Sequence, residues 1–171
     1  MSCGKVILSH GLESGPQATK VAAMAAAAIA LGWDEVRPDY RDLDASQDVR
    51  RIDDRIARML VQVPADGTPF VLAGSSMGAF VSALGSLQRA PRGLFLLAPP
   101  VRVPGYPRAL DAAAVPTVIV HGWDDELIPA ADVIAYAHRR RAALHLVDDT
   151  HRLTAHVDVI ARWFGDWLAR L

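Results

Sequence analysis

The segment FVLAGSSMGA, from Phe70 to Ala79, is the most informative part of this chain. A short apolar run, typical of a strand buried on both faces, passes directly into a helical pattern. Gly74 and Gly78 stand two residues before and two residues after Ser76. A sharp strand-to-helix turn leaves room only for small side chains at these two positions, and it projects the serine side chain outward. A tight glycine turn with a capping serine is the simpler alternative.

Similar apolar runs recur along the chain and alternate with helical patterns. Most of them are continuously apolar, which is typical of parallel strands covered on both faces. Pro38 cannot donate to a strand ladder, so we expect its strand at an edge of the sheet. The expected strands are Lys5–Ser9, Glu35–Tyr40, Phe70–Ala73, Leu94–Ala98, Thr117–Val120 and Leu144–Asp148.

Helical patterns fill the intervals between these strands. The first opens on a Ser14-x-x-Gln17 capping pattern and closes on Gly32. The expected helices are Pro16–Leu31, Val49–Val63, Ser76–Arg89, Pro129–Arg141 and Val157–Leu171. This alternation predicts an α/β fold, a three-layer α/β/α sandwich around a mainly parallel sheet of about six strands. We expect residues 1–171 to form a single domain.

Composition excludes several classes of protein. Of the 171 residues, 51% are hydrophobic and 22% charged, which argues against intrinsic disorder. A net charge of -1 gives no basis for binding nucleic acid or an anionic membrane through bulk charge. The longest apolar run, Val21–Leu31, falls short of the about 20 residues that a spanning helix needs. Cys3 is the single cysteine, so no intrachain disulfide can form, and we expect a cytoplasmic protein.

Three further segments carry polar groups beside expected strands. The segment SHGLESGP, residues 9–16, ends the first strand, and HGWDDELIP, residues 121–129, follows the fifth. The last strand leads into DTHRL, residues 149–153. A serine hydroxyl is a poor nucleophile and needs a general base, which a histidine supplies. These segments therefore offer the partners that a reactive Ser76 requires.

The order of these segments resembles that of the α/β-hydrolase superfamily, whose triad runs nucleophile, acid, histidine. The resemblance implies Ser76 as nucleophile, Asp125 as acid and His151 as general base. Ser75 occupies the tolerant position of the G-x-S-x-G pattern. Two alternatives stay open at this point, Asp124 for the acid and His156 for the base.

The same resemblance implies two backbone donors for a developing oxyanion. One is the N–H of Met77, directly after the nucleophile, and the other is the N–H of Leu12 in the HG segment. Within that segment, the resemblance gives His10 a role in shaping the loop through hydrogen bonds to backbone.

Many members insert a lid domain, but none fits into the stretch from Pro99 to Pro116, which holds only 18 residues. We therefore expect a minimal α/β-hydrolase fold without a cap domain, with an open site bordered by Val101–Pro107 and Trp123. Trp123 packs over the site or is buried as a structural tryptophan; both alternatives stay open. The sequence shows neither a metal-binding motif nor a phosphate-binding loop, so we expect no metal and no cofactor.

The resulting hypothesis is a small serine hydrolase, similar to esterases and thioesterases. It would cleave small carboxylic ester or thioester substrates through an acyl-enzyme on Ser76. The alternative is a non-catalytic binding or interaction protein with the same fold. The expected partner is a small-molecule ester, with neither nucleic acid nor membrane. The sequence does not determine the size of the acyl group or the oligomeric state; a homodimer is one of the open alternatives.

Overall fold

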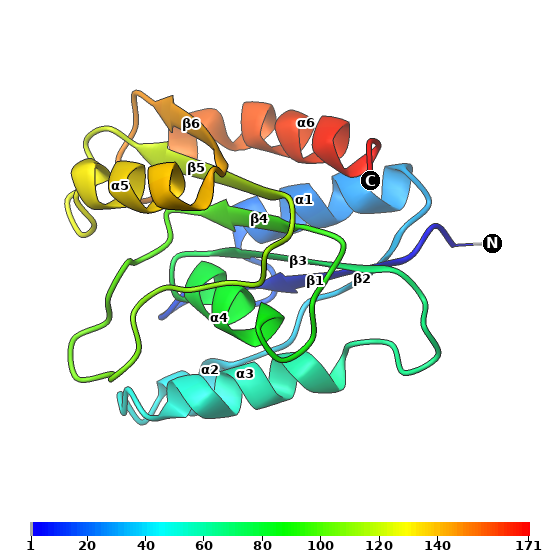
Figure 1. Ribbon diagram of the computed structural model, residues 1–171, viewed down its shortest axis with the longest axis horizontal. Helices are drawn as coiled ribbons and strands as arrows, with labels where there is room; N and C mark the ends of the chain where they lie inside the picture. The colour runs from blue at the N-terminus through cyan, green and yellow to red at the C-terminus, as the bar shows by residue number, and fades with distance from the viewer. Residues whose placement is uncertain (1) are drawn as a thin grey trace.

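Six parallel strands form one sheet in the computed structural model, which describes residues 2–171 (Figure 1). Their order is β2-β1-β3-β4-β5-β6, and every neighbouring pair is parallel. The strands are β1 (Lys5–Ser9), β2 (Asp34–Val36), β3 (Phe70–Ser75), β4 (Leu94–Leu97), β5 (Thr117–Gly122) and β6 (Ala143–Val147). The predicted α/β class with its parallel sheet is confirmed.

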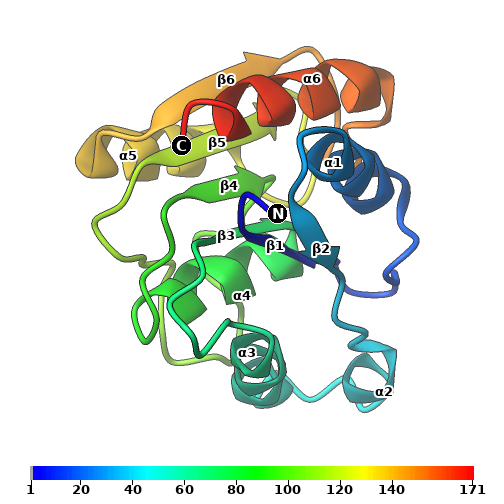
Figure 2. The same cartoon turned by 90° about the vertical axis from the view of Figure 1, so that its right-hand side faces the viewer.

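Helices cover both faces of this sheet. The helices are α1 (Thr19–Ala30), α2 (Arg41–Asp44), α3 (Arg51–Val61), α4 (Met77–Ser86), α5 (Ala130–Arg140) and α6 (Val157–Leu168), with a 3-10 turn at Thr154–His156. Helices α1 and α6 lie side by side on one face, while α4 and α5 cover the other and α3 packs outside α4 (Figure 2). Within residues 2–171, no helix has the length and apolar character that crossing a membrane demands.

The central strands are buried on both faces, because successive side chains point to opposite sides. On β3, Val71 and Ala73 join the apolar cluster under α1 and α6, whereas Leu72 joins the cluster under α4. On β4, Phe95 packs against Phe164 of α6 with ring centroids 5.2 Å apart. Two separate apolar cores therefore fix the position of the sheet between its helices.

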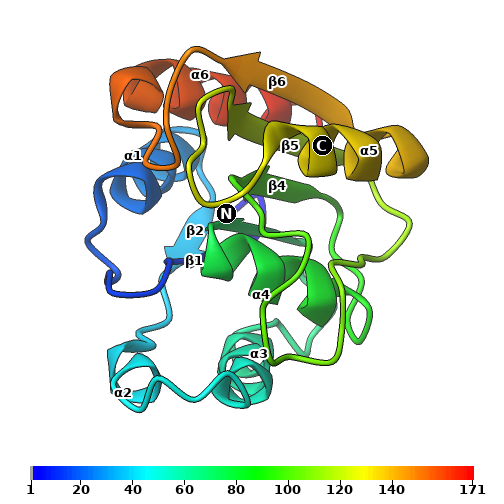
Figure 3. The ribbon, with the colours of Figure 1, turned by 90° about the vertical axis from the view of Figure 1, so that its left-hand side faces the viewer.

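The carboxyl ends of the strands meet at one edge of the sheet, which faces the viewer in Figure 3. The loops after β1, β3, β5 and β6 gather there. The segment from 98 to 116 runs beside α4 and contains a single antiparallel bridge, between Arg102 and Ala109. Tyr106 fixes this segment, because its hydroxyl donates to Asp53 on α3 (2.6 Å). As predicted, the described chain carries no cap domain.

Several predicted boundaries are wrong. Strand β2 ends at Val36, although its predicted edge position is confirmed. Helix α1 begins at Thr19, and Ala18 caps it without a side-chain hydrogen bond, so the Ser14-x-x-Gln17 pattern is not its cap. Its predicted end at Gly32 is correct, because Gly32 has a φ of 76° and closes the helix by donating to Ile29. The short helix α2 was not predicted.

Replacing Phe164 tests the core on the α1–α6 face. Phe164 is fully buried, so we expect Phe164→Ala to lower the free energy of unfolding by about 3–5 kcal/mol. Urea titration followed by far-UV circular dichroism measures this change. The matched control is Ile29→Ala on α1, where the side chain is 59% exposed and the expected change is within about 0.5 kcal/mol. Equal effects of the two substitutions would contradict the assignment of this core.

Candidate active site

Ser76 occupies a strained turn between β3 and α4. Its φ is 54°, a left-handed value that a non-glycine residue seldom adopts. A Cβ on Gly74 would lie 2.4 Å from the backbone of Gly78, and a Cβ on Gly78 would lie 2.0 Å from the carbonyl oxygen of Ser9. Only glycine fits at both positions, so the sequence pattern permits the close approach that this turn requires.

Three side chains from distant parts of the chain form one hydrogen-bonded series. The distance from Ser76 Oγ to His151 Nε2 is 2.9 Å, and that from His151 Nδ1 to Asp125 Oδ2 is 2.8 Å. Because a carboxylate can only accept, Nδ1 carries the proton and Nε2 is left to accept from the serine hydroxyl. The Asp125 side chain is fully buried, and that of His151 is 13% exposed. The histidine is therefore in place to take a proton from Ser76.

The loop after β5 holds the Asp125 carboxylate in position. The backbone N–H groups of Leu127 and Ile128 both donate to Asp125 Oδ1, at 2.9 and 2.8 Å. Buried His121 lies beside the carboxylate, and its Nε2 donates to the carbonyl of Ile128 (3.0 Å). Asp125 Oδ2 thus remains available for His151.

A second carboxylate, Asp149, organises the loop that carries His151. It accepts hydrogen bonds from the N–H groups of Thr150 and Ala155 and from His156 Nδ1, at 2.8, 3.0 and 2.8 Å. Burial raises the pKa of the Asp149 carboxyl, but these donors outweigh it and hold the pKa below its ordinary value. No sequence pattern indicates this role, because the partners of Asp149 come together only once the loop folds.

The same loop is attached to two other parts of the molecule. Lys20 of α1 donates to the carbonyl of Arg152 (2.5 Å), and the N–H of His151 donates to Glu126 (3.1 Å). Both attachments restrict how far the histidine can move from Ser76.

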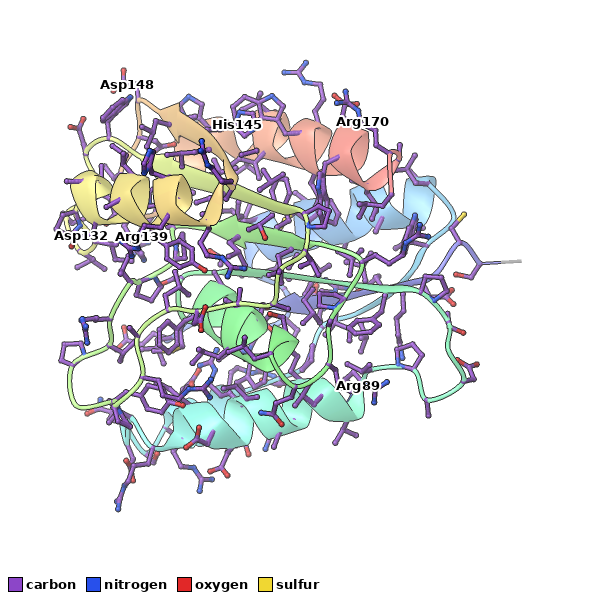
Figure 4. All side chains as sticks on the ribbon, in the orientation of Figure 1. Arg89, Asp132, Arg139, His145, Asp148 and Arg170 are labelled. Atoms are coloured by element: carbon purple, nitrogen blue, oxygen red, sulfur yellow. The ribbon has the colours of Figure 1, made fainter. Side chains whose placement is uncertain are left out.

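The other candidate residues lie away from this series. Asp124 is exposed, His156 bonds to Asp149, and Ser75 is buried in the last position of β3. His145 lies on β6 and stacks on Trp163 of α6, with ring centroids 4.3 Å apart (Figure 4). The structure therefore brings His151 to Asp125 and Ser76, and leaves the alternatives outside.

The two predicted backbone donors lie close to the serine. Met77 is the first residue of α4, and Leu12 follows Gly11, whose Cβ position would lie 3.4 Å from Ser76 Cβ. Among residues 2–171, neither the N–H of Met77 nor that of Leu12 donates to a protein acceptor. Both N–H groups are thus free to donate to a substrate oxygen.

A buried network shapes the loop that contains Leu12. The N–H of Tyr40 donates to His10 Nε2 (3.0 Å), which leaves the proton on Nδ1, 2.8 Å from the carbonyl of Gly11. Arg55, 1% exposed, donates to the carbonyl of His10 (2.6 Å) and pairs with Asp44. The expected loop-shaping role of His10 agrees with these bonds, but sequence reasoning missed Arg55.

The border of the site is partly open. Trp123 is 55% exposed, which excludes the buried structural alternative for this residue. Valines 101 and 103 are partly buried against the α4 side of the core. Within residues 2–171, no group of three or more His, Cys, Asp or Glu side chains could hold a metal ion.

Comparisons with known proteins identify the family of this chain. Residues 2–157 match the family described as alpha/beta hydrolase domain. The fold is similar to that of a candidate hydrolase of the alpha/beta superfamily from Xanthomonas campestris pv. campestris, with 50% identity and a TM-score of 0.91, over 98% of this chain and 99% of the other. The chain belongs to the alpha/beta hydrolase family. A comparison with curated proteins gives no match.

Two more distant structures share the fold. One is a serine hydrolase without a lid from Xanthomonas campestris, at 20% identity and a TM-score of 0.73, over 99% of this chain and 83% of the other. Another is an esterase from Pyrococcus furiosus, at 16% identity and a TM-score of 0.72, over 99% of this chain and 82% of the other. At this level of identity, the likeness concerns the fold alone.

The two buried histidines predict how stability depends on pH. Burial lowers the pKa of His10 and of His121 below the ordinary value of 6.5. Folding therefore disfavours protonation of both rings, whereas the unfolded chain binds their protons below about pH 6.5. Stability is therefore full above that pH and falls as the pH drops through the lowered values. Urea titrations between pH 7.5 and 4.5 measure the decline.

A matched pair of variants isolates this effect. We expect His121→Gln to reduce the slope of stability against pH in this range, because one of the two buried groups no longer titrates. His138→Gln, at an exposed position of α5, should leave the slope unchanged. An unchanged slope in His121→Gln would show that this histidine does not take up its proton on unfolding.

Proposed function

We propose that the protein is a serine hydrolase that cleaves small carboxylic ester or thioester substrates, with Ser76, His151 and Asp125 as its catalytic triad. The observation that supports this most directly is the pair of hydrogen bonds, 2.9 and 2.8 Å, that joins Ser76 to His151 and His151 to Asp125. A binding protein has no physical need for such a series.

In the first half of the reaction, Ser76 Oγ attacks the carbonyl carbon of the ester while His151 Nε2 accepts the hydroxyl proton. The carbonyl oxygen becomes an oxyanion and accepts hydrogen bonds from the N–H groups of Met77 and Leu12. Asp125 stabilises the imidazolium. His151 then gives its proton to the leaving alcohol or thiol, the bond to the carbonyl carbon breaks, and the acyl group remains on Ser76.

In the second half, a water molecule takes the place of the leaving group. His151 removes one of its protons as the water oxygen attacks the acyl carbon, and the same donors bind the second oxyanion. When the intermediate collapses, His151 returns the proton to Ser76 Oγ. The carboxylic acid leaves and the serine is regenerated. Every proton therefore moves through one nitrogen atom, His151 Nε2.

Two neighbouring serines provide a test of the nucleophile. We expect Ser76→Ala to lower kcat for p-nitrophenyl acetate by a factor on the order of 10⁴–10⁶. Ser75→Ala, one position earlier at the end of β3, should retain activity within a few-fold. Release of p-nitrophenolate measures both. A folded wild-type protein without activity would instead favour the non-catalytic binding alternative.

Two neighbouring carboxylates test the acid in the same way. Asp125→Asn keeps the shape of the side chain but cannot stabilise the imidazolium, so kcat should fall by a factor on the order of 10⁴. Asp124→Asn changes an exposed side chain that is not bonded to His151, and kcat should stay within about twofold of wild type. Equal losses in the two variants would contradict the assignment of Asp125.

A further inference from the structure

One cavity of about 530 Å³ is lined by Met77, the residue after Ser76, and by Leu12 of the loop after β1. Its walls come from the loop after β1, from α2 and the loop that follows it, from the first turns of α3, from the start of α4, and from the segment after β4. Seven apolar residues line it: Leu12, Leu43, Ala45, Val49, Ile52, Met77 and Val103. Its volume lies within the roughly 300–1,000 Å³ that small-molecule sites occupy.

The charged groups around this cavity are balanced. It is lined by three basic side chains, Arg41, Arg51 and Arg55, and by three acidic ones, Glu13, Asp44 and Asp48. Each of these arginines has its own carboxylate partner within the described chain: Arg41 pairs with Asp39, Arg51 with Asp54, and Arg55 with Asp44. A negatively charged ligand would thus meet no unpaired cation, and burying its charge here would be costly.

The position of the cavity relative to the triad indicates which part of a substrate it receives. Met77 and Leu12, the two oxyanion donors, line it, whereas neither His151 nor any other residue of the loops after β5 and β6 does. A leaving group must lie next to His151 Nε2, which protonates it. The leaving group therefore extends toward the histidine, and the cavity lies on the acyl side of the carbonyl carbon.

We propose that this cavity is the acyl pocket of the enzyme and that it selects uncharged, extended acyl groups, leaving the alcohol or thiol portion outside. The proposal rests on the proposed serine hydrolase function. The walls of the cavity depend on α2 and the loop that follows it. Residues 41–52 and Val103, rather than a lid, therefore set the acyl preference.

Two series of esters test this assignment in the wild-type protein. In the first, the leaving group is p-nitrophenolate and the acyl group grows from acetyl through butanoyl to hexanoyl. We expect kcat/KM to rise roughly threefold for each added methylene that the cavity buries. In the second, the acyl group is acetyl and the alcohol grows from ethanol to hexanol. Here kcat/KM should stay within about threefold across the series.

A charged acyl group provides a further comparison. The mono-p-nitrophenyl ester of succinic acid resembles the butanoate ester in length but carries a carboxylate. We expect its kcat/KM to be at least about tenfold below that of the butanoate, since the cavity offers this carboxylate no unpaired cation. Faster hydrolysis of the succinate would overturn the preference for uncharged groups.

A matched pair of variants, one just before α3 and one at its end, tests whether the cavity wall causes the acyl preference. Val49→Phe puts a larger side chain into the cavity wall, and we expect the ratio of hexanoate to acetate kcat/KM to fall at least fivefold. Val61→Phe makes the same change at the other end of α3, where the side chain is 79% exposed and does not line the cavity. That variant should keep the wild-type ratio. Thermal melting checks that both variants fold.

The outcomes separate the two proposals. If the wild type hydrolyses none of these esters, the proposed function fails. If it hydrolyses the acetate but shows no gain with acyl length, or gains with alcohol length instead, the function stands and the pocket assignment is wrong. The ester series with the wild-type protein is sufficient to test the pocket assignment. The test therefore does not depend on whether the Val49→Phe variant folds.

Discussion

The close contact between Gly78 and the backbone of Ser9 and His10 is the constraint on which the site depends. A Cβ at Gly78 would lie 2.0 Å from the carbonyl oxygen of Ser9 and 2.7 Å from that of His10. The start of α4 is thereby seated directly against the end of β1. Together with the close approach of Gly74 to Gly78, this contact permits the strained turn at Ser76, and it places the end of β1, which leads to Leu12, beside the start of α4. The proposed nucleophile and the proposed oxyanion donors therefore meet where α4 begins and β1 ends.

Much of this arrangement could be predicted from sequence, because local patterns specify it. The glycines around Ser76, the HG segments at residues 10 and 121, and the position of His151 after the last strand each lie next to a recognisable strand. A parallel sheet then brings those strand ends to one edge. Local patterns do not separate Asp125 from Asp124, because the choice depends on which carboxylate the turn after β5 directs inward. The structure shows that Asp125 reaches His151.

The features that were missed are those made by tertiary contact. Helix α2 has only four residues and no apolar period, so no pattern marked it. Arg55 lies within the predicted helix Val49–Val63, but no pattern marked it as buried. Its side chain lies over the ring of Tyr40, 4.4 Å from the centroid, and pairs with Asp44. The hydrogen bond between Asp149 and His156 likewise depends on a loop conformation. Residues of α2 and Arg55 line the cavity, and Asp149 organises the loop that carries His151. The shape of the cavity therefore could not be predicted from the sequence.

The most direct test of the account is covalent labelling of the wild-type protein with a fluorophosphonate, followed by intact mass measurement and peptide mapping. If His151 and Asp125 activate Ser76 as the geometry indicates, one label should attach to each chain, on Ser76, and His151→Gln should abolish it. A folded wild-type protein that takes no label, or that takes it on Ser75, would contradict the central claim.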